Sequence, residues 1–379
     1  MTPQHLIFVA DHLACGGAER HMVALASGLA RRGHRVTVAY LKAQADLAGE
    51  LAQHSVRCVC CASEGGLDRA ALRRLVALID IERPGLVVAT SQYSLMFGAL
   101  ARLRAERRPR LAFICHSTDV VRRGARARLR FLVYRQFYRL AHCVVFVSEQ
   151  QRRYFAALGM RFVRTEVVHN GIDLAHFSMA APGRRAQLRQ ALGFAADDLV
   201  VGLCAVLREE KRHADLLAAV ARLRAQGLPL KVLLVGDGPM RKDIESRRGQ
   251  LGLEGAVVLA GFQHDVRPFI EACDIMALTS HSETFPIATL EYMALAKALV
   301  ASDVGGVREQ VAHGESGLLY RAGDIDALTA ALRRTADPCL RARLGQGALA
   351  AVQARFGLPV MLERYEILFG TLLTRPAAP

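Results

Sequence analysis

The sequence predicts an α/β protein of two domains, each built on a doubly wound parallel sheet. Its 379 residues suggest two domains at about 100–200 residues per domain. A hydrophobic content of 52% with 22% charged residues excludes a disordered chain. Short apolar runs alternate with longer helical patterns, and this alternation occurs twice along the chain.

The first alternation predicts a domain over residues 1–175. We expect strands at 5–10, 35–41, 86–90, 111–115 and 143–147, separated by helices. The segment 176–197 contains Pro182-Gly183 and lacks a strand pattern, so it is predicted as an interdomain linker. A second alternation predicts another domain over 198–357, and sheets of this kind bind ligands beyond the carboxyl ends of their strands. Two such sheets therefore predict a central cleft.

The cysteines and the first apolar run bear on cellular location. The nine cysteines are scattered, and alternation in Cys58, Cys60 and Cys61 is more typical of a strand than of a metal site. No run approaches the roughly 18–20 apolar residues of a membrane span. Leu6 to Ala10 is too short for a signal peptide, so we expect a cytoplasmic protein with reduced thiols.

The net charge of +15 is unevenly distributed. Residues 101–166 hold 16 Arg and four acidic residues, so this window carries +12. Only five of the 50 cationic residues are Lys, which indicates a general bias toward Arg. The alternative is that this window binds an anionic surface, either phospholipid or nucleic acid.

The approach to a predicted helix at 286–297 carries the most chemical information. Pro286 is suited to open a helix, and the free N–H groups at a helix start can bind an anion. Glu283 precedes this helix and Glu291 lies inside it, so an elongated ligand such as a nucleotide sugar could meet a carboxylate at each end. From spacing alone, a first-turn acid and an exposed helix residue explain the two glutamates equally well.

Other residues that suit a phosphate also follow predicted strands. Gly16-Gly17 follows the first strand, where the absence of Cβ atoms lets a ligand approach the backbone. Arg208 and Lys211 follow the strand that opens the second domain and can neutralise a diphosphate. Ordinary turns explain each of these alone, and the chain lacks both GxGxxG and GxxxxGK[ST].

Six stretches in order resemble the retaining glycosyltransferases of family 4, which have the two-domain GT-B fold with Rossmann-like domains. The stretches cover nearly the whole chain: Gly16–Arg20, Val167–Asp173, Lys211–Leu217, Leu234–Pro239, Glu283–Glu291 and Gly305-Gly306 before Glu309. The resemblance implies that residues 358–379 form a helix crossing back to the N-terminal, acceptor-side domain, and that the C-terminal domain binds the nucleotide sugar.

The resemblance also implies site residues. Glu283 and His116 are the implied catalytic residues, since Glu283 would contact hydroxyls of the donor sugar and His116, at the end of a buried strand, would lie near it. Glu291 would bind the ribose. The donor diphosphate would be held by a larger set: Arg208, Lys211, Gly16, Gly17, Phe285 and Pro286. For His116, a half-buried structural side chain is the alternative.

We expect no metal cofactor, because the basic pair and the helix amides can stabilise the charge of the leaving diphosphate. The Asp-x-Asp at Asp324 is better explained as a helix N-cap. Retention of anomeric configuration is implied by the resemblance alone. No nucleophile is evident in the sequence, which favours substitution on the front face of the sugar.

The stretch 120–140 predicts a basic amphipathic helix with Phe131, Tyr134 and Tyr138 along one side. Burial of that side in the core and binding to an anionic membrane explain the pattern equally well. The second would make the protein peripheral at the inner face of the cytoplasmic membrane.

The sequence therefore favours a glycosyltransferase that moves a sugar from a nucleotide-sugar donor to a surface-glycan or lipid-linked saccharide acceptor. We expect the donor to be a UDP-sugar. One alternative is another GT-B enzyme, such as a sugar-nucleotide epimerase. The other is an Arg-rich protein that binds nucleic acid or another anionic polymer. No signature of a nucleic-acid-binding module supports it, so we expect no nucleic-acid partner.

Overall fold

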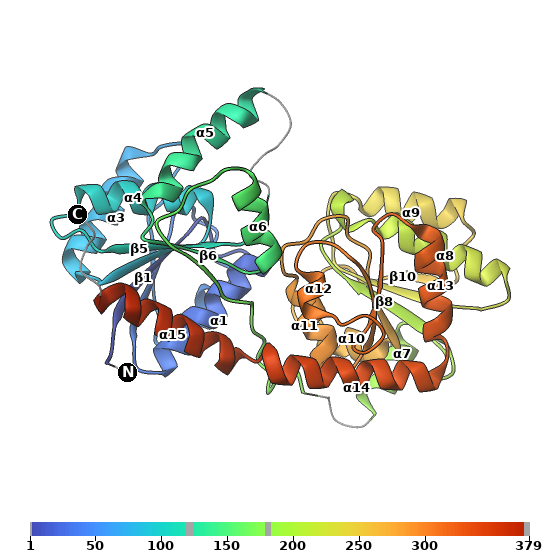
Figure 1. Ribbon diagram of the computed structural model, residues 1–379. Helices are drawn as coiled ribbons and strands as arrows, with labels where there is room; N and C mark the ends of the chain where they lie inside the picture. Colours follow the sequence, from blue (N-terminus) through green and yellow to red (C-terminus); the bar gives the residue numbers. More distant parts are fainter. Residues whose placement is uncertain (1, 119–124, 179–182, 375–379) are drawn as a thin grey trace. The chain divides into compact units, whose positions relative to one another are not determined.

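The computed structural model describes residues 2–118, 125–178 and 183–374, and the chain divides into two compact units. Unit 1 comprises residues 1–170 with 358–379, and unit 2 comprises residues 171–357. Both are α/β units with parallel sheets, as the sequence predicts. Figure 1 shows the helices and strands of each unit.

Unit 1 contains a seven-stranded parallel sheet in the order β3-β2-β1-β4-β5-β6-β7. Its strands are β1 His5–Ala10, β2 Arg35–Tyr40, β3 Arg57–Cys60, β4 Leu86–Ala89, β5 Arg110–Cys115, β6 Cys143–Phe146 and β7 Thr165–Val167. Its helices are α1 Gly17–Arg31, α2 Ala48–Gln53, α3 Arg69–Glu82, α4 Gln92–Arg104, α5 Ala125–Leu140, α6 Glu149–Ala157 and α15 Leu358–Thr374. Helices α1 and α15 lie along one face of the sheet, and α3, α4 and α5 lie along the other (Figure 1).

Unit 2 contains a six-stranded parallel sheet in the order β10-β9-β8-β11-β12-β13. Its strands are β8 Val200–Cys204, β9 Lys231–Val235, β10 Val257–Leu259, β11 Ile275–Leu278, β12 Ala298–Ser302 and β13 Leu318–Tyr320. Its helices are α7 Arg184–Ala191, α8 His213–Ala225, α9 Arg241–Gln250, α10 Arg267–Ala272, α11 Ile287–Ala294, α12 Val307–Gln310, α13 Ile325–Thr335 and α14 Pro338–Arg355. A short 3-10 turn, η1 Glu209–Lys211, follows β8.

Both strand orders reverse at one point in the sheet. In unit 1 the reversal lies between β1 and β4, and in unit 2 it lies between β8 and β11. Loops on either side of such a point diverge, which leaves room for a ligand beyond the carboxyl ends of the two central strands. All four central strands are buried along their length or nearly so, which fits their continuous apolar sequences.

The segment 176–197 differs from its prediction as a linker. The chain enters unit 2 at Gly171, and the described part of the segment contains helix α7. Arg185 and Arg189 of α7 form ion pairs with Asp274, which precedes β11. Because Arg189 is almost fully buried, this helix is part of the folded unit and not a free connection.

The last helix, α15, packs within unit 1. Its Glu366 accepts hydrogen bonds from Arg32 and from Nε2 of His34, the latter at 3.0 Å. The other ring nitrogen of His34 accepts from the Gln4 amide at 3.1 Å, so the ring fills both roles as a neutral imidazole. Helix α15 thus lies beside α1 and fixes its C-terminal end.

Helix α5 differs in part from the predicted amphipathic helix. Tyr138 is fully buried, and Phe131 packs against the core of unit 1. This side of α5 therefore faces the protein interior, so its aromatic residues cannot supply a lipid-binding face. Residues 120–124 of the predicted stretch lie outside the described residues. None of the described helices is long and apolar enough to cross a bilayer.

Candidate functional site

The strongest constellation of polar groups lies at the reversal point of the unit 2 sheet. Nζ of Lys211, at the end of the turn after β8, donates to Oε1 of Glu283 at 2.7 Å. Glu283 belongs to the loop after β11, so the pair joins the two loops that flank the reversal point. The side chains are 23% and 9% exposed, so the ion pair is largely shielded from water.

Hydroxyl groups at the strand ends hold this pair in place. Ser280 donates to the same Oε1 of Glu283 at 2.6 Å, and Thr279 donates to the carbonyl of Lys211 at 2.7 Å. Ser302, the last residue of β12, donates to the carbonyl of Ser280 at 2.5 Å. None of these hydroxyls was predicted, although Thr279 and Ser280, as polar residues directly after the apolar run of β11, were a visible signal.

The turn at Gly305-Gly306 packs directly against the Glu283 loop. Gly305 has a φ of +51°, and a Cβ atom there would lie 1.7 Å from the carbonyl oxygen of Glu283. The Gly306 amide donates to the carbonyl of Thr284 at 2.9 Å. Only glycine allows this approach, so the turn shapes the backbone of the Glu283 loop.

Glu291 lies on α11, which faces the end of β8. The hydroxyl of Tyr292 accepts from the Cys204 amide at 2.9 Å. The Cys204 thiol has a pKa well above its usual value because of burial first, then Cys273 and the negative charge of Glu291. Glu291 is therefore close to the end of β8, the strand that leads into the Lys211 turn.

Arg208, another predicted site residue of unit 2, has an exposed side chain. Arg208 is in the same turn as Lys211, with its side chain 61% exposed and 3.9 Å from Glu210. The exposed guanidinium is available to an anion.

Phe285, predicted to contact the diphosphate, has a buried side chain. Its side chain is 3% exposed and packs against the ring of Phe356 with centroids 5.6 Å apart. Aromatic packing removes this side chain from the solvent-facing surface, so only its backbone could contact a diphosphate. Pro286 is the N-cap residue of α11, and its carbonyl accepts from Gln310 at 2.9 Å. Proline has no N–H, so donors at this helix start come from the residues that follow.

The carboxyl edge of the unit 2 sheet also exposes apolar side chains that were not predicted. Phe262, after β10, is 53% exposed, and Val206, after β8, is 42% exposed. The Gly236 amide, after β9, donates to the carbonyl of Gly261 at 2.8 Å, which joins the loops of β9 and β10. The edge therefore presents apolar surface on one side of the charged pair, which suits a flat apolar group.

Gly16, Gly17 and His116 belong to unit 1, at the carboxyl edge of its sheet. Gly16 is the N-cap residue of α1, and a Cβ atom there would lie 2.3 Å from Oε2 of Glu19. A Cβ on Gly17 would meet nothing within 4 Å. The carboxylate of Glu19 thus lies over Gly16, while Gly17 leaves open space beside it.

Two polar residues missed by the sequence analysis lie at the unit 1 reversal point. Asp11 follows β1, and its carboxylate accepts from the hydroxyl of Ser91, which caps α4 after β4. Burial raises the pKa of Asp11, against the opposing effects of Ser91, His12 and Lys42. An acid directly after the first buried strand was the sequence signal for it.

His116 follows β5 and has a clamped backbone. Gln151 of α6 donates to the carbonyl of Cys115 at 2.9 Å and to the carbonyl of Ser117 at 3.4 Å. The oxygen of the same amide accepts from the Val147 amide at 3.0 Å. Burial lowers the pKa of His116 to about 4, so the imidazole is neutral near pH 7.

The described residues contain no group of three or more His, Cys, Asp or Glu side chains placed to hold a metal ion. Asp324 accepts from the Ala327 amide at 2.8 Å and caps α13, as predicted. The candidate site of unit 2 thus combines two carboxylates, two cations and an exposed aromatic ring at one sheet edge. That arrangement suits a ligand with an anionic centre and hydroxyl groups at either side.

Two protein families match this chain. Residues 15–176 match the family described as Glycosyltransferase Family 4, and residues 184–349 match Glycosyl transferases group 1. A D-inositol 3-phosphate glycosyltransferase of Stackebrandtia nassauensis is 34% identical over 200 residues, which are 49% of this chain and 44% of that protein. The N-acetyl-alpha-D-glucosaminyl L-malate synthase of Bacillus anthracis is 29% identical over 188 residues, 49% of each protein. The chain spans about half the length of the curated relatives it matches.

Solved structures match almost the whole chain. Anabaena Alr3699/HepE in complex with UDP-glucose superposes with a TM-score of 0.85 at 25% identity, covering 97% of this chain and 100% of that one. Two parallel-sheet units of this kind form the GT-B fold. With both halves matched by glycosyltransferase families, this chain belongs to glycosyltransferase family 4.

Proposed function

We propose that this protein transfers a sugar from a nucleotide-sugar donor, a UDP-sugar in the first instance, to a surface-glycan or lipid-linked saccharide acceptor. The observation that carries the proposal is the Lys211–Glu283 pair at the reversal point of the unit 2 sheet. The Anabaena relatives were solved with UDP and with UDP-glucose, which supports a uridine nucleotide as the donor.

The ion pair suggests how the donor is bound. In the free protein Lys211 and Glu283 neutralise each other in a partly dehydrated site. A diphosphate offers Lys211 a stronger anionic partner, and the sugar hydroxyls then offer Glu283 hydrogen-bond donors. Arg208 adds a second cation, and Glu291 accepts from the ribose hydroxyls. The exposed Phe262 provides a surface for the base.

Charge stabilisation is the main contribution we propose to the reaction. As the bond between the sugar and the diphosphate breaks, negative charge grows on the leaving phosphate, and cations already in place stabilise it. The predicted roles of Gly16 and Gly17 beside the diphosphate, and of His116 beside the sugar, stay part of this proposal. Since His116 is neutral near pH 7, it would act through a hydrogen bond and not through charge.

The first prediction concerns the ion pair itself. Glu283→Gln keeps the shape of the side chain but removes its charge, so we expect the rate of sugar transfer to fall about 10²–10³-fold while UDP still binds. Lys211→Met should instead weaken UDP binding. Transfer assays and calorimetry with UDP measure the two effects, and Glu245→Gln on α9 is the matched control. Full activity of Glu283→Gln would exclude the proposed role.

The second prediction concerns metals. We propose that Lys211 and Arg208 supply the charge that a divalent ion supplies in other transferases, so the enzyme needs no metal cofactor. Treatment with EDTA should leave the rate unchanged, and added Mg²⁺ or Mn²⁺ should raise it less than twofold. A rate that EDTA abolishes and Mn²⁺ restores would contradict this proposal.

The third prediction concerns stereochemistry. We propose retention of the anomeric configuration by substitution on the front face of the sugar, as the family resemblance implies. The anomeric coupling constant of freshly formed product, measured by NMR, should match that of the donor. Mass spectrometry should find no glycosyl adduct on the protein, and a trapped adduct would exclude the front-face route.

The fourth prediction concerns membranes. Helix α5 exposes Leu132, Val133 and Leu140, with exposed fractions of 53%, 49% and 37%, and Arg139 is exposed beside them. We propose that this face contacts an anionic membrane that carries the acceptor. Sedimentation with vesicles containing phosphatidylglycerol should retain the protein at low salt. The double variant Leu132→Ser/Val133→Ser should reduce retention several-fold, and equal retention on neutral vesicles would contradict the proposal.

The Arg-rich alternative is a protein that binds nucleic acid or another anionic polymer, and it predicts a different dependence of binding on salt and on Glu283. Its binding would fall steeply with salt and would not respond to Glu283→Gln. An epimerase would turn over the donor without any acceptor. The polymer-binding alternative does not explain why the two loops at the unit 2 reversal point carry a largely shielded ion pair.

A further inference from the structure

Three ring side chains form a buried polar cluster behind the end of β5. His21 of α1 and His116 lie edge to face, with ring centroids 4.6 Å apart, and the ring of Tyr365 from α15 lies 5.9 Å from His21. His21 is 2% exposed and Tyr365 is fully buried. The cluster therefore joins three segments of unit 1 that are distant in sequence.

The polar atoms of this cluster are unusual. Both ring nitrogens of His21, Nε2 of His116 and the hydroxyl of Tyr365 are buried without a hydrogen-bond partner among the described residues. A buried polar atom that lacks a partner destabilises the folded protein. Phenylalanine in place of His21 or of Tyr365 would fill similar space without that cost, so packing alone does not explain these residues.

The three groups can satisfy one another after small ring rotations. Histidine rings at this separation can bring a nitrogen of each to about 3 Å, the range of a hydrogen bond. A neutral imidazole has one donor and one acceptor, and a phenol has one of each. Burial first, and then the electrostatic interaction with His116, hold the pKa of His21 well below its usual value. Burial also lowers the pKa of His116 to about 4, so both rings are neutral near pH 7.

We propose that His21 and Tyr365 are positioning residues that fix the tautomer of His116. The phenol is the stronger acid, so Tyr365 donates to one nitrogen of His21, and the N–H on the other nitrogen of His21 donates to Nε2 of His116. His116 then carries its own proton on Nδ1 and offers that N–H to an oxygen of the bound ligand. This proposal deepens the proposed function, since it rests on His116 facing substrate.

Two features make this arrangement suitable for positioning. The clamp by Gln151 fixes the backbone on both sides of His116, so the ring is the only part left to orient. His116 is half-buried as a whole residue, and its Nε2 is buried. Preorganised donors of this kind lower the barrier of a reaction because no reorientation is needed at the moment of transfer.

The test reads the tautomer directly by NMR. In protein labelled with ¹⁵N-histidine, the His116 signals are assigned by their loss in His116→Gln. We expect His116 in the Nδ1–H form, unchanged between pH 6 and 8, although free histidine favours the Nε2–H form. In His21→Phe the ring contact stays but the donor is lost, so the Nε2–H form should appear. Finding the Nε2–H form in the unaltered protein would overturn the proposal.

Kinetics provide the second readout. His21→Phe should lower kcat about tenfold with less than a twofold change in KM for the donor, and Tyr365→Phe should lower kcat about threefold. The double variant His21→Phe/His116→Gln should lose no more than His116→Gln alone, since one residue acts through the other. Additive losses would mean that His21 has only a structural role.

Matched controls separate positioning from stability. Tyr320→Phe removes another buried hydroxyl without a partner, in unit 2, and should leave kcat and the His116 signals unchanged. His142→Phe removes a half-buried histidine at the opposite edge of the unit 1 sheet and should leave the His116 tautomer unchanged. If no transfer activity is found with any donor, the tautomer measurement still decides this inference separately from the proposed function.

Discussion

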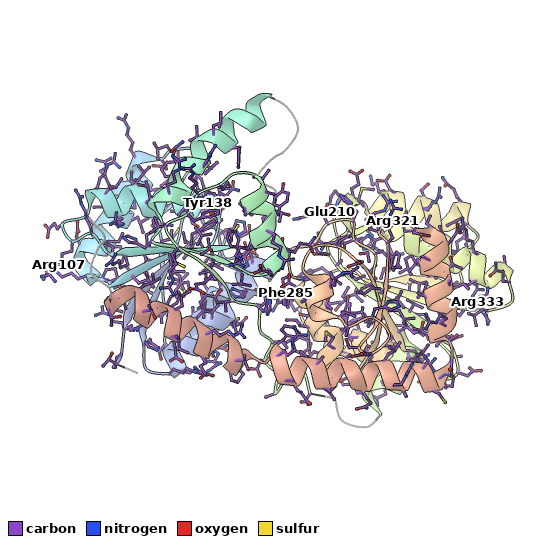
Figure 2. The ribbon with its side chains drawn as sticks, in the orientation of Figure 1. Arg107, Tyr138, Glu210, Phe285, Arg321 and Arg333 are labelled. Atoms are coloured by element: carbon purple, nitrogen blue, oxygen red, sulfur yellow. The ribbon has the colours of Figure 1, made fainter. Side chains whose placement is uncertain are left out.

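The ion pair between Lys211 and Glu283 is the constraint on which the candidate site of unit 2 depends. A lysine and a glutamate this far from water persist only because each neutralises the other, and removing one partner of such a pair leaves a costly buried charge. The fold creates that situation by ending β8 and β11 side by side at the point where the strand order reverses. Figure 2 shows Phe285 and Glu210 among the side chains of unit 2.

The hydroxyls around the pair have a separate role, because they bond to backbone as well as to the carboxylate. Thr279 and Ser302 fix carbonyl groups of Lys211 and Ser280, so the loops hold their shape when the ion pair opens. Gly305 contributes by close approach to the Glu283 backbone. A ligand that replaces the ion pair can therefore exchange partners with two side chains while the backbone stays fixed, which keeps the cost of binding low.

The sequence was sufficient to predict charged site residues that lie in loops at strand ends or at a helix start. Lys211, Glu283 and Glu291 were predicted from their places after strands and around a helix start, and the structure brings them to one edge of the unit 2 sheet. At Phe285 the sequence indicated an anion site but not the packing of the side chain on Phe356, which leaves the backbone for the predicted role. Sequence position alone cannot tell which way a loop side chain points.

Contacts that depend on the tertiary structure could not be predicted from the sequence for a similar reason. Ser280 was visible as a polar residue, but its bond to Glu283 depends on the loop conformation that Gly305 allows. The linker prediction failed because the pattern of α7 is short and polar, and its anchor, Asp274, lies 85 residues from Arg189. The aromatic side of α5 could be read as core or as lipid-facing, and only packing against the unit 1 core decides for the interior.

The candidate site of unit 2 and the ring cluster of unit 1 differ in the charge of their polar groups. At the unit 2 site, Lys211 and Glu283 have opposite charges and each satisfies the other. In unit 1, His21, His116 and Tyr365 are neutral, and their rings touch while several polar atoms stay unsatisfied. A neutral cluster binds an anion poorly but can set the direction of a hydrogen bond. The proposed charge neutralisation in unit 2 and the proposed hydrogen-bond direction in unit 1 therefore call for different chemistry, which the residues at each sheet edge provide.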